Sequence, residues 1–74
     1  MKPTIGRIVH YHCTEEEQKL LNNYQSIAPA IITAVWSETT VNLKVLTDGN
    51  FNLWKTSVTL GEGNYNWSWP VKEE

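Results

Sequence analysis

The 74-residue sequence predicts a small all-β protein, a five-stranded barrel that forms one domain over residues 1–74. Short segments rich in β-branched and aromatic residues recur along the chain, and turn-forming residues separate them. A chain near 60 residues buries only about 60% of its unfolded surface. The single cysteine excludes a disulfide within one chain, so we expect a homo-oligomer to supply the missing stability.

The first strand is expected at residues 5–12, which follow Pro3 and are rich in β-branched and aromatic residues. Thr14 and Glu17 then form a capping box, the pattern that starts a helix. Residues 18–21 continue this helix before two asparagines stop it. No partner helix exists for it, so the sequence predicts a short helical turn inside a long first loop.

The second strand is expected at residues 29–36, with Pro29 at its start, where a missing N–H is tolerated. The third strand is expected at residues 41–47, because apolar and polar residues alternate there. This alternation points Val41, Leu43 and Val45 inward, and Asn42 and Lys44 outward.

A tight hairpin is expected at residues 48–50, since Asp-Gly favours the positive φ values that such a turn needs. Residues 51–60 return as the fourth strand, and residues 61–64 form a glycine-containing turn. Residues 65–71 form a short fifth strand, which Pro70 confines to an edge or to the strand's end.

This order of elements is typical of an SH3-like barrel, with a long first loop and three strands joined by short turns. Closing the sheet also removes the exposed edges of an isolated meander. An OB-type barrel is the alternative, but it normally has a longer chain and a helix between its third and fourth strands. Here the helical signal lies between the first and second strands.

The four tryptophans are the main functional signal. Trp67 and Trp69 are two residues apart, so they share one strand face, and we expect them to be partly exposed near the chain terminus. Trp36 and Trp54 lie within strands and belong either to the core or to a binding groove. Strict alternation puts Trp36 on the face of Ile32, and Trp54 on the face of Val58.

A ligand site is expected on this aromatic surface, completed at a subunit interface. Indole rings stack on nucleotide bases, cations meet phosphates, and hydroxyls add donors. The candidate ligand-binding residues are Arg7, His10, Tyr11, Trp36, Trp54, Lys55, Ser57, Trp67 and Trp69. The alternative is that these residues are ordinary core, interface and surface positions.

The charge balance limits the classes of molecule that the protein is expected to bind. Six basic residues against eight acidic ones give a net charge of −2, and the basic residues are scattered, which argues against long nucleic acids. A mononucleotide or a short cyclic nucleotide needs fewer cations and stays compatible. No apolar run reaches the roughly 20 residues of a membrane span. A lone cysteine without a hydrophobic leader indicates the cytoplasm.

Catalysis and metal binding are not expected. His10 and His12 share a strand face that Cys13 does not, and structural zinc needs four ligands. Cys13 has no identifiable orienting partner as a nucleophile. The run at residues 15–17 reads as a solvated acidic face. The sequence therefore predicts a non-enzymatic protein without a metal or a cofactor.

An ordered series of short segments resembles a group of small proteins encoded by tailed phages and prophages. The segments are residues 6–11, 29–36, 41–43, 48–49, 56–58 and 67–70. The resemblance spans nearly the whole chain except residues 13–28, and it brings no catalytic or binding residues with it. It implies a viral origin, and hence the cytoplasm of an infected bacterial host.

Two functions follow as expectations. The first is a counter-defence sponge that sequesters a nucleotide-type immune signal without enzymatic activity. The second is an SH3-like interaction module whose aromatic groove takes a peptide of a host or phage protein.

Overall fold

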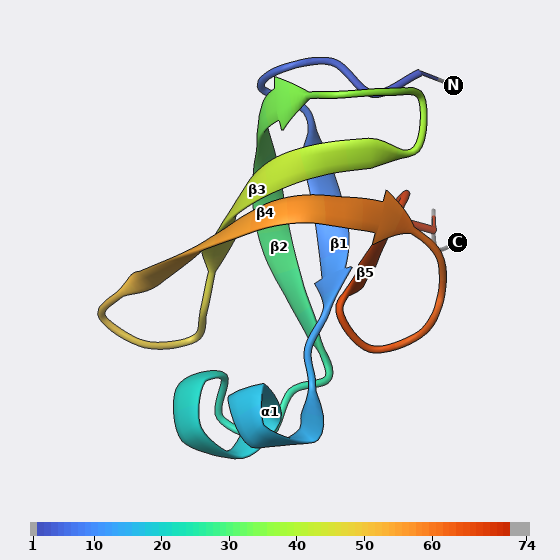
Figure 1. The fold of residues 1–74 in the computed structure, drawn as a ribbon. Coiled ribbons are helices and arrows are strands. Elements are labelled where there is room, and N and C mark those ends of the chain that lie inside the picture. The colour runs from blue at the N-terminus through green and yellow to red at the C-terminus, as the bar shows by residue number, and fades with distance from the viewer. Residues whose placement is uncertain (1, 72–74) are drawn as a thin grey trace.

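The computed structural model describes residues 2–71 as a closed barrel of five strands with one short helix (Figure 1). The predicted small, SH3-like all-β barrel is confirmed. Most strands match the predicted ranges within a few residues. The elements in chain order are β1 (Ile8–His12), α1 (Glu15–Leu21), β2 (Ile27–Val35), β3 (Thr40–Leu46), β4 (Asn52–Leu60) and β5 (Asn66–Ser68).

The short strand β5 closes the barrel. Strands β1 to β4 pair with their sequence neighbours in antiparallel fashion. Strand β5 then lies between β1 and β4, antiparallel to the first and parallel to the second, with Trp67 opposite both Tyr11 and Leu60. It thus occupies the two sheet edges that β1 and β4 would otherwise expose. It ends at Ser68, so it is shorter than the predicted range of residues 65–71, and Pro70 lies outside it.

The barrel interior holds a compact apolar core. The inward alternation predicted for β3 is confirmed, since Val41, Leu43 and Val45 are all buried. Trp67 is 0% exposed, so the expected partial exposure of this residue is wrong. Trp67 faces the interior, and because β5 closes the barrel, the core encloses its side chain completely. The indole N–H donates to the Thr39 carbonyl at 3.0 Å, which satisfies its one donor.

A β-bulge in β4 changes which side chains face the core. Val41 pairs with Val58 and Leu43 pairs with Lys55, so two residues of β4 oppose one of β3. Ser57 has a φ of 55°, the left-handed value that accommodates the extra residue. In the part of β4 that precedes the bulge, the side chains that face the core are therefore the opposite set from the one that strict alternation from Val58 predicts. Trp54 points outward, not to the face of Val58 as strict alternation predicts.

A second bulge in β2 has the same effect on Trp36. Ile32 pairs with Leu43 and Ala34 pairs with Asn42, which leaves Thr33 as the extra residue. The inward pattern of the first half of β2 is therefore interrupted after Ile32. Trp36 follows the strand on the outer side, so the prediction that it shares the face of Ile32 is wrong.

The β3–β4 connection is a hairpin, but it is not the expected tight Asp-Gly turn. The strands end at Leu46 and resume at Asn52, so the loop has more than two residues. Gly49 does not adopt a positive φ. The loop is held instead by the Thr47 hydroxyl, which donates to the Phe51 carbonyl at 2.7 Å.

Helix α1 is the predicted helical turn and lies at one end of the barrel (Figure 1). Both capping-box bonds are present: Thr14 Oγ1 accepts from the Glu17 N–H, and Glu17 Oε1 accepts from the Thr14 N–H. The helix ends at Leu21 with Asn22 as its C-cap, and Asn23 and Tyr24 then adopt positive φ values of 51° and 67°. These turn the chain back toward β2.

We expect Trp67→Ala to lower the free energy of unfolding by about 3–5 kcal/mol, because it empties a large buried volume in the core. Trp54→Ala, at an exposed position, should change it by about 0.5 kcal/mol. Urea unfolding followed by circular dichroism measures both values. Equal losses for the two variants would contradict the assignment of Trp67 to the core.

Candidate functional site

The two bulges place two tryptophans on the outside of the sheet formed by β2, β3 and β4. Trp36 is 64% exposed and Trp54 is 59% exposed, although both are large apolar side chains. The core alternative for these two residues is therefore wrong. Together with Asn42 and Lys44 of β3, they form a surface that we call the outer aromatic face.

Asn42 is the hydrogen-bonding centre of this face. It is only 7% exposed, and its Oδ1 atom lies between the two bulges. It accepts from Trp36 Nε1 at 2.8 Å, from the Ser57 backbone N–H at 2.9 Å and from Thr56 Oγ1 at 3.1 Å. One side-chain oxygen thus holds the Trp36 indole against the sheet and satisfies the backbone of the β4 bulge.

Lys44 supplies the positive charge of the outer aromatic face. It is exposed and pairs directly with Trp54 across the β3–β4 ladder. Directly paired residues have Cβ atoms about 5 Å apart. Asn42 and Lys44 are two residues apart on one strand, so the positions beside Trp36 and Trp54 are about 7 Å apart. The two indoles and the ammonium group therefore belong to one patch.

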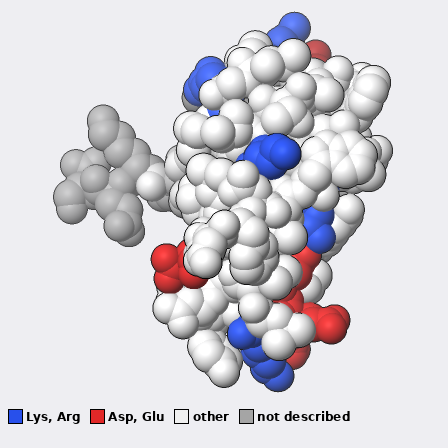
Figure 2. All heavy atoms as spheres, turned by 90° about the vertical axis from the view of Figure 1, so that its left-hand side faces the viewer, with Lys and Arg blue, Asp and Glu red and all other residues white. Residues whose placement is uncertain are grey.

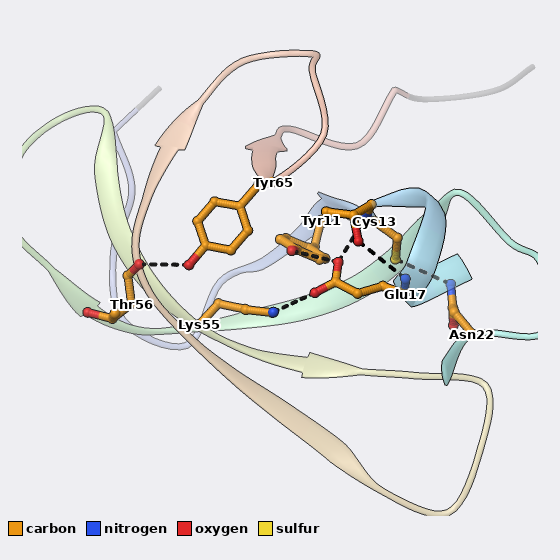
Figure 3. Close-up of polar contacts among 8 residues, drawn as sticks. Tyr11, Cys13, Glu17, Asn22, Lys55, Thr56 and Tyr65 are labelled. Carbon is orange, nitrogen blue, oxygen red and sulfur yellow. Dashed lines mark hydrogen bonds and ion pairs between the residues drawn. The ribbon is translucent and has the colours of Figure 1, made fainter. Parts of the chain in front are cut away.

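A second cluster of polar side chains fills the end of the barrel near α1 (Figure 3). Lys55 forms an ion pair with Glu17, and both side chains are mostly buried. Tyr11 OH donates to Glu17 Oε1 at 2.9 Å. The ammonium group also lies 5.9 Å from the centre of the Tyr11 ring and 5.3 Å from that of Tyr65, within cation–π range.

The acidic helix is therefore not simply a solvated face, as the sequence suggested. Burial alone would raise the pKa of Glu17, but hydrogen bonds from Lys55, the Thr14 N–H and Tyr11 outweigh it and lower that pKa. Burial, reinforced by the hydrogen bond to Glu17, raises the pKa of Tyr11. Glu17 is thus a charged anchor that fastens α1 to the barrel.

The Arg7 and Trp69 side chains contact each other near β5, the strand that closes the barrel. The Arg7 guanidinium lies 5.2 Å from the centre of the Trp69 ring, and the Trp69 ring packs edge-on against Trp67 at 5.2 Å between centroids. Trp69 is partly buried against the core. Arg7 and the Trp67–Trp69 pair therefore strengthen barrel closure.

The histidines and the cysteine do not form a reactive group. His12 Nε2 hydrogen-bonds to Ser68 Oγ at 2.8 Å, whereas Cys13 is buried in the core. Burial, together with the negative charge of Glu17, raises the pKa of the Cys13 thiol, the opposite of what a nucleophile needs. Within residues 2–71, no group of three or more His, Cys, Asp or Glu side chains is placed to hold a metal ion.

The structure divides the nine predicted site residues among separate places. Trp36 and Ser57 hydrogen-bond to Asn42, and Trp54 pairs with Lys44 on the same outer face. Tyr11 and Trp67 are in the core, and Lys55 points into the barrel end. Arg7 and Trp69 lie together near β5, and His10 is on β1 opposite Ser68 and Pro29.

Sequence reasoning missed Asn42 and Glu17 as key residues. Asn42 occupies a regular outward position, and nothing in its neighbourhood marks two flanking bulges. Glu17 carried the capping-box signal, which correctly located the helix but not its ion pair with Lys55 across the barrel end. That contact joins residues distant in sequence, so local patterns do not reveal it.

No family model matches the chain, and neither the curated proteins nor the solved structures contain a match to it. In the described part of the chain, no helix is long and apolar enough to cross a membrane.

We expect Asn42→Ala to destabilise the protein by about 1–3 kcal/mol, because three donors lose one buried acceptor. The matched control is Asn52→Ala, which removes the same side chain from an exposed position of β4. Chemical denaturation compares the two. An Asn42→Ala variant as stable as the control would show that the shared oxygen does not support the bulges.

The Glu17 ion pair predicts a specific acid sensitivity. Its folded-state pKa lies below the unfolded value of about 4.3, so its stabilising contribution is present above that value and is lost as pH falls through the folded-state pKa. Glu17→Gln should cost about 3 kcal/mol at pH 7, because Lys55 stays buried without its partner. The variant should also lack this part of the stability loss, which the wild type shows as pH falls below about 4.3.

Urea titrations across this pH range measure both effects, with the exposed Glu16→Gln as the control. Glu16→Gln should keep the wild-type pH profile. A wild-type profile in Glu17→Gln would contradict the anchoring role of the ion pair.

Proposed function

We propose that this protein is a non-enzymatic binding protein that sequesters a small nucleotide-type ligand on its outer aromatic face. The observation that carries the proposal is the direct pairing of the exposed Trp54 with Lys44. A base stacks on an indole with about 1–3 kcal/mol, and an adjacent ammonium group meets a phosphate. Trp36 offers a second exposed ring on the same patch.

The distribution of the basic residues limits the size of the ligand. Lys55 is paired with Glu17 inside the barrel end, and Arg7 packs on Trp69. Figure 2 shows blue side chains separated by uncharged and acidic surface on the face in view, without a continuous basic stripe. Such an arrangement favours a ligand with one or two phosphates over a long polyanion.

A homo-oligomer would complete the site. The outer aromatic face is an open surface of a single chain, whereas nucleotide sites usually enclose most of the ligand. A second copy stacked over the two indoles would enclose the base and remove the exposed aromatic surface from water. Together with the resemblance to phage proteins, this supports a counter-defence sponge acting in the cytoplasm of an infected bacterium.

The second candidate function is a peptide-binding module, and a separate observation favours it. Ile8 pairs with Ile31, Ile31 pairs with Lys44, and Lys44 pairs with Trp54, which forms one outward row across four strands. Ile8 is 50% exposed. A partly apolar row of this kind suits the side chains of a host or phage protein segment.

The test is native mass spectrometry of the protein purified from bacteria that produce cyclic-nucleotide defence signals. We expect an oligomer that carries a few hundred daltons of ligand, identified after its release. Calorimetry with that ligand should show an affinity loss of about 5- to 150-fold for Trp54→Ala, which corresponds to about 1–3 kcal/mol. The control is Lys19→Ala on α1, which should bind normally.

A ligand-free protein that binds none of a panel of mono- and cyclic nucleotides would contradict sequestration. If Trp54→Ala then abolished capture of a defined peptide, the peptide-binding function would replace it. Normal nucleotide binding by Trp54→Ala would instead move the site away from the outer aromatic face.

A further inference from the structure

A groove of about 310 Å³ opens in the barrel wall between β2 and β3. Its apolar lining comes from Ile27, Pro29 and Leu46, and Asp48 lies among its polar lining residues. This volume is at the lower end of the range for small-ligand pockets. None of the groove residues belongs to the outer aromatic face.

The sequence explains why the two strands separate at this point. The β2–β3 pairing reaches Ala30 opposite Val45 and goes no further toward α1. The next residue of β2 in that direction is Pro29, which has no N–H to donate to a ladder. Beyond it, β2 runs to the helix while β3 runs into the hairpin loop (Figure 1).

The far end of the groove is fixed by a buried amide. Asn22 is 2% exposed; its Nδ2 atom donates to the Ile27 carbonyl at 3.2 Å, and its Oδ1 atom accepts from the Asp48 N–H at 2.8 Å. The side chain thus bridges the separated strands where ladder bonds are missing. The groove is therefore preformed, which lowers the entropic cost of binding.

The residues that line the groove favour a cation carried on an aliphatic chain. Among the described residues that line the groove, Asp48 alone carries a charge, and it is exposed. Asn23 Nδ2 donates to its Oδ2 atom at 3.2 Å, which orients the carboxylate. Aliphatic carbons fit against the apolar wall, and a guanidinium group pairs with a carboxylate. The same carboxylate repels an anionic nucleotide.

We propose that this groove binds an arginine side chain of a partner protein, with its methylenes on Pro29 and Leu46 and its guanidinium on Asp48. Both loops that border the groove carry an exposed ring, Tyr24 after α1 and Phe51 in the hairpin loop. These rings provide contact area for residues that flank the arginine, which favours a protein segment over a free small cation.

The experiment is an NMR titration of the ¹⁵N-labelled 74-residue chain with two capped tripeptides, Leu-Arg-Leu and its citrulline analogue. Citrulline has nearly the same shape as arginine but no charge. We expect the amide signals of Ile27, Leu46 and Asp48 to shift, and the arginine peptide to bind about two- to fivefold tighter, the range of an exposed ion pair. Free butylguanidinium should bind more weakly than the peptide.

Asp48→Asn should abolish the preference for arginine over citrulline, because the backbone N–H that bonds to Asn22 is unchanged while the charge is lost. Glu38→Gln, an exposed carboxylate in the β2–β3 turn, is the matched control and should retain the preference. The wild-type comparison of the two peptides decides the proposal even if Asp48→Asn does not fold.

Three results would overturn the proposal: equal affinity for the two peptides, shifts confined to other surfaces, or no shift at millimolar peptide. An undiminished preference in a folded Asp48→Asn variant would also overturn it. Butylguanidinium that binds as tightly as the peptide would refute a protein partner.

Discussion

The outer surface of this barrel depends on one buried oxygen, Asn42 Oδ1. It accepts from Trp36 Nε1, Thr56 Oγ1 and the Ser57 N–H. The last of these satisfies the backbone of the β4 bulge, where an unpaired donor would be costly. The bulge reverses the alternation of β4, so Trp54 points outward and Lys55 inward. The exposure of the Trp36 and Trp54 indoles and the position of Lys55 inside the barrel end therefore both follow from the strand geometry around Asn42.

This geometry separates buried positions from exposed positions among residues of the same type. Trp67 and Tyr11 are fully buried and pair across β5 and β1, while Trp36 and Trp54 remain exposed. Among the cations, Lys55 forms an ion pair with Glu17 inside the barrel end, whereas Lys44 lies on the outer surface beside Trp54. A large apolar ring exposed to water lowers solubility and stability, which is why we propose a binding role for the exposed pair.

The sequence predicted the fold well, because the barrel follows from local signals. The capping box located α1, and the alternation of Val41, Leu43 and Val45 oriented β3. The candidate site was predicted less well. A bulge adds one residue without a distinctive local pattern, so Trp36 and Trp54 were put on the wrong faces. The ion pair between Glu17 and Lys55 joins distant segments, and no periodicity encodes it.

The most direct test of this account is the solvent exposure of the four indole N–H groups, measured by NMR with a soluble gadolinium chelate. After assignment by single Trp→Phe substitutions, the Trp54 signal should broaden strongly. Trp67, which is buried and bonded to the Thr39 carbonyl, should be protected. The hydrogen-bonded Trp36 should broaden in the wild type and more so in Asn42→Ala. Strong broadening of Trp67 together with protection of Trp54 would contradict the assignment of Trp67 to the core and Trp54 to the outer surface.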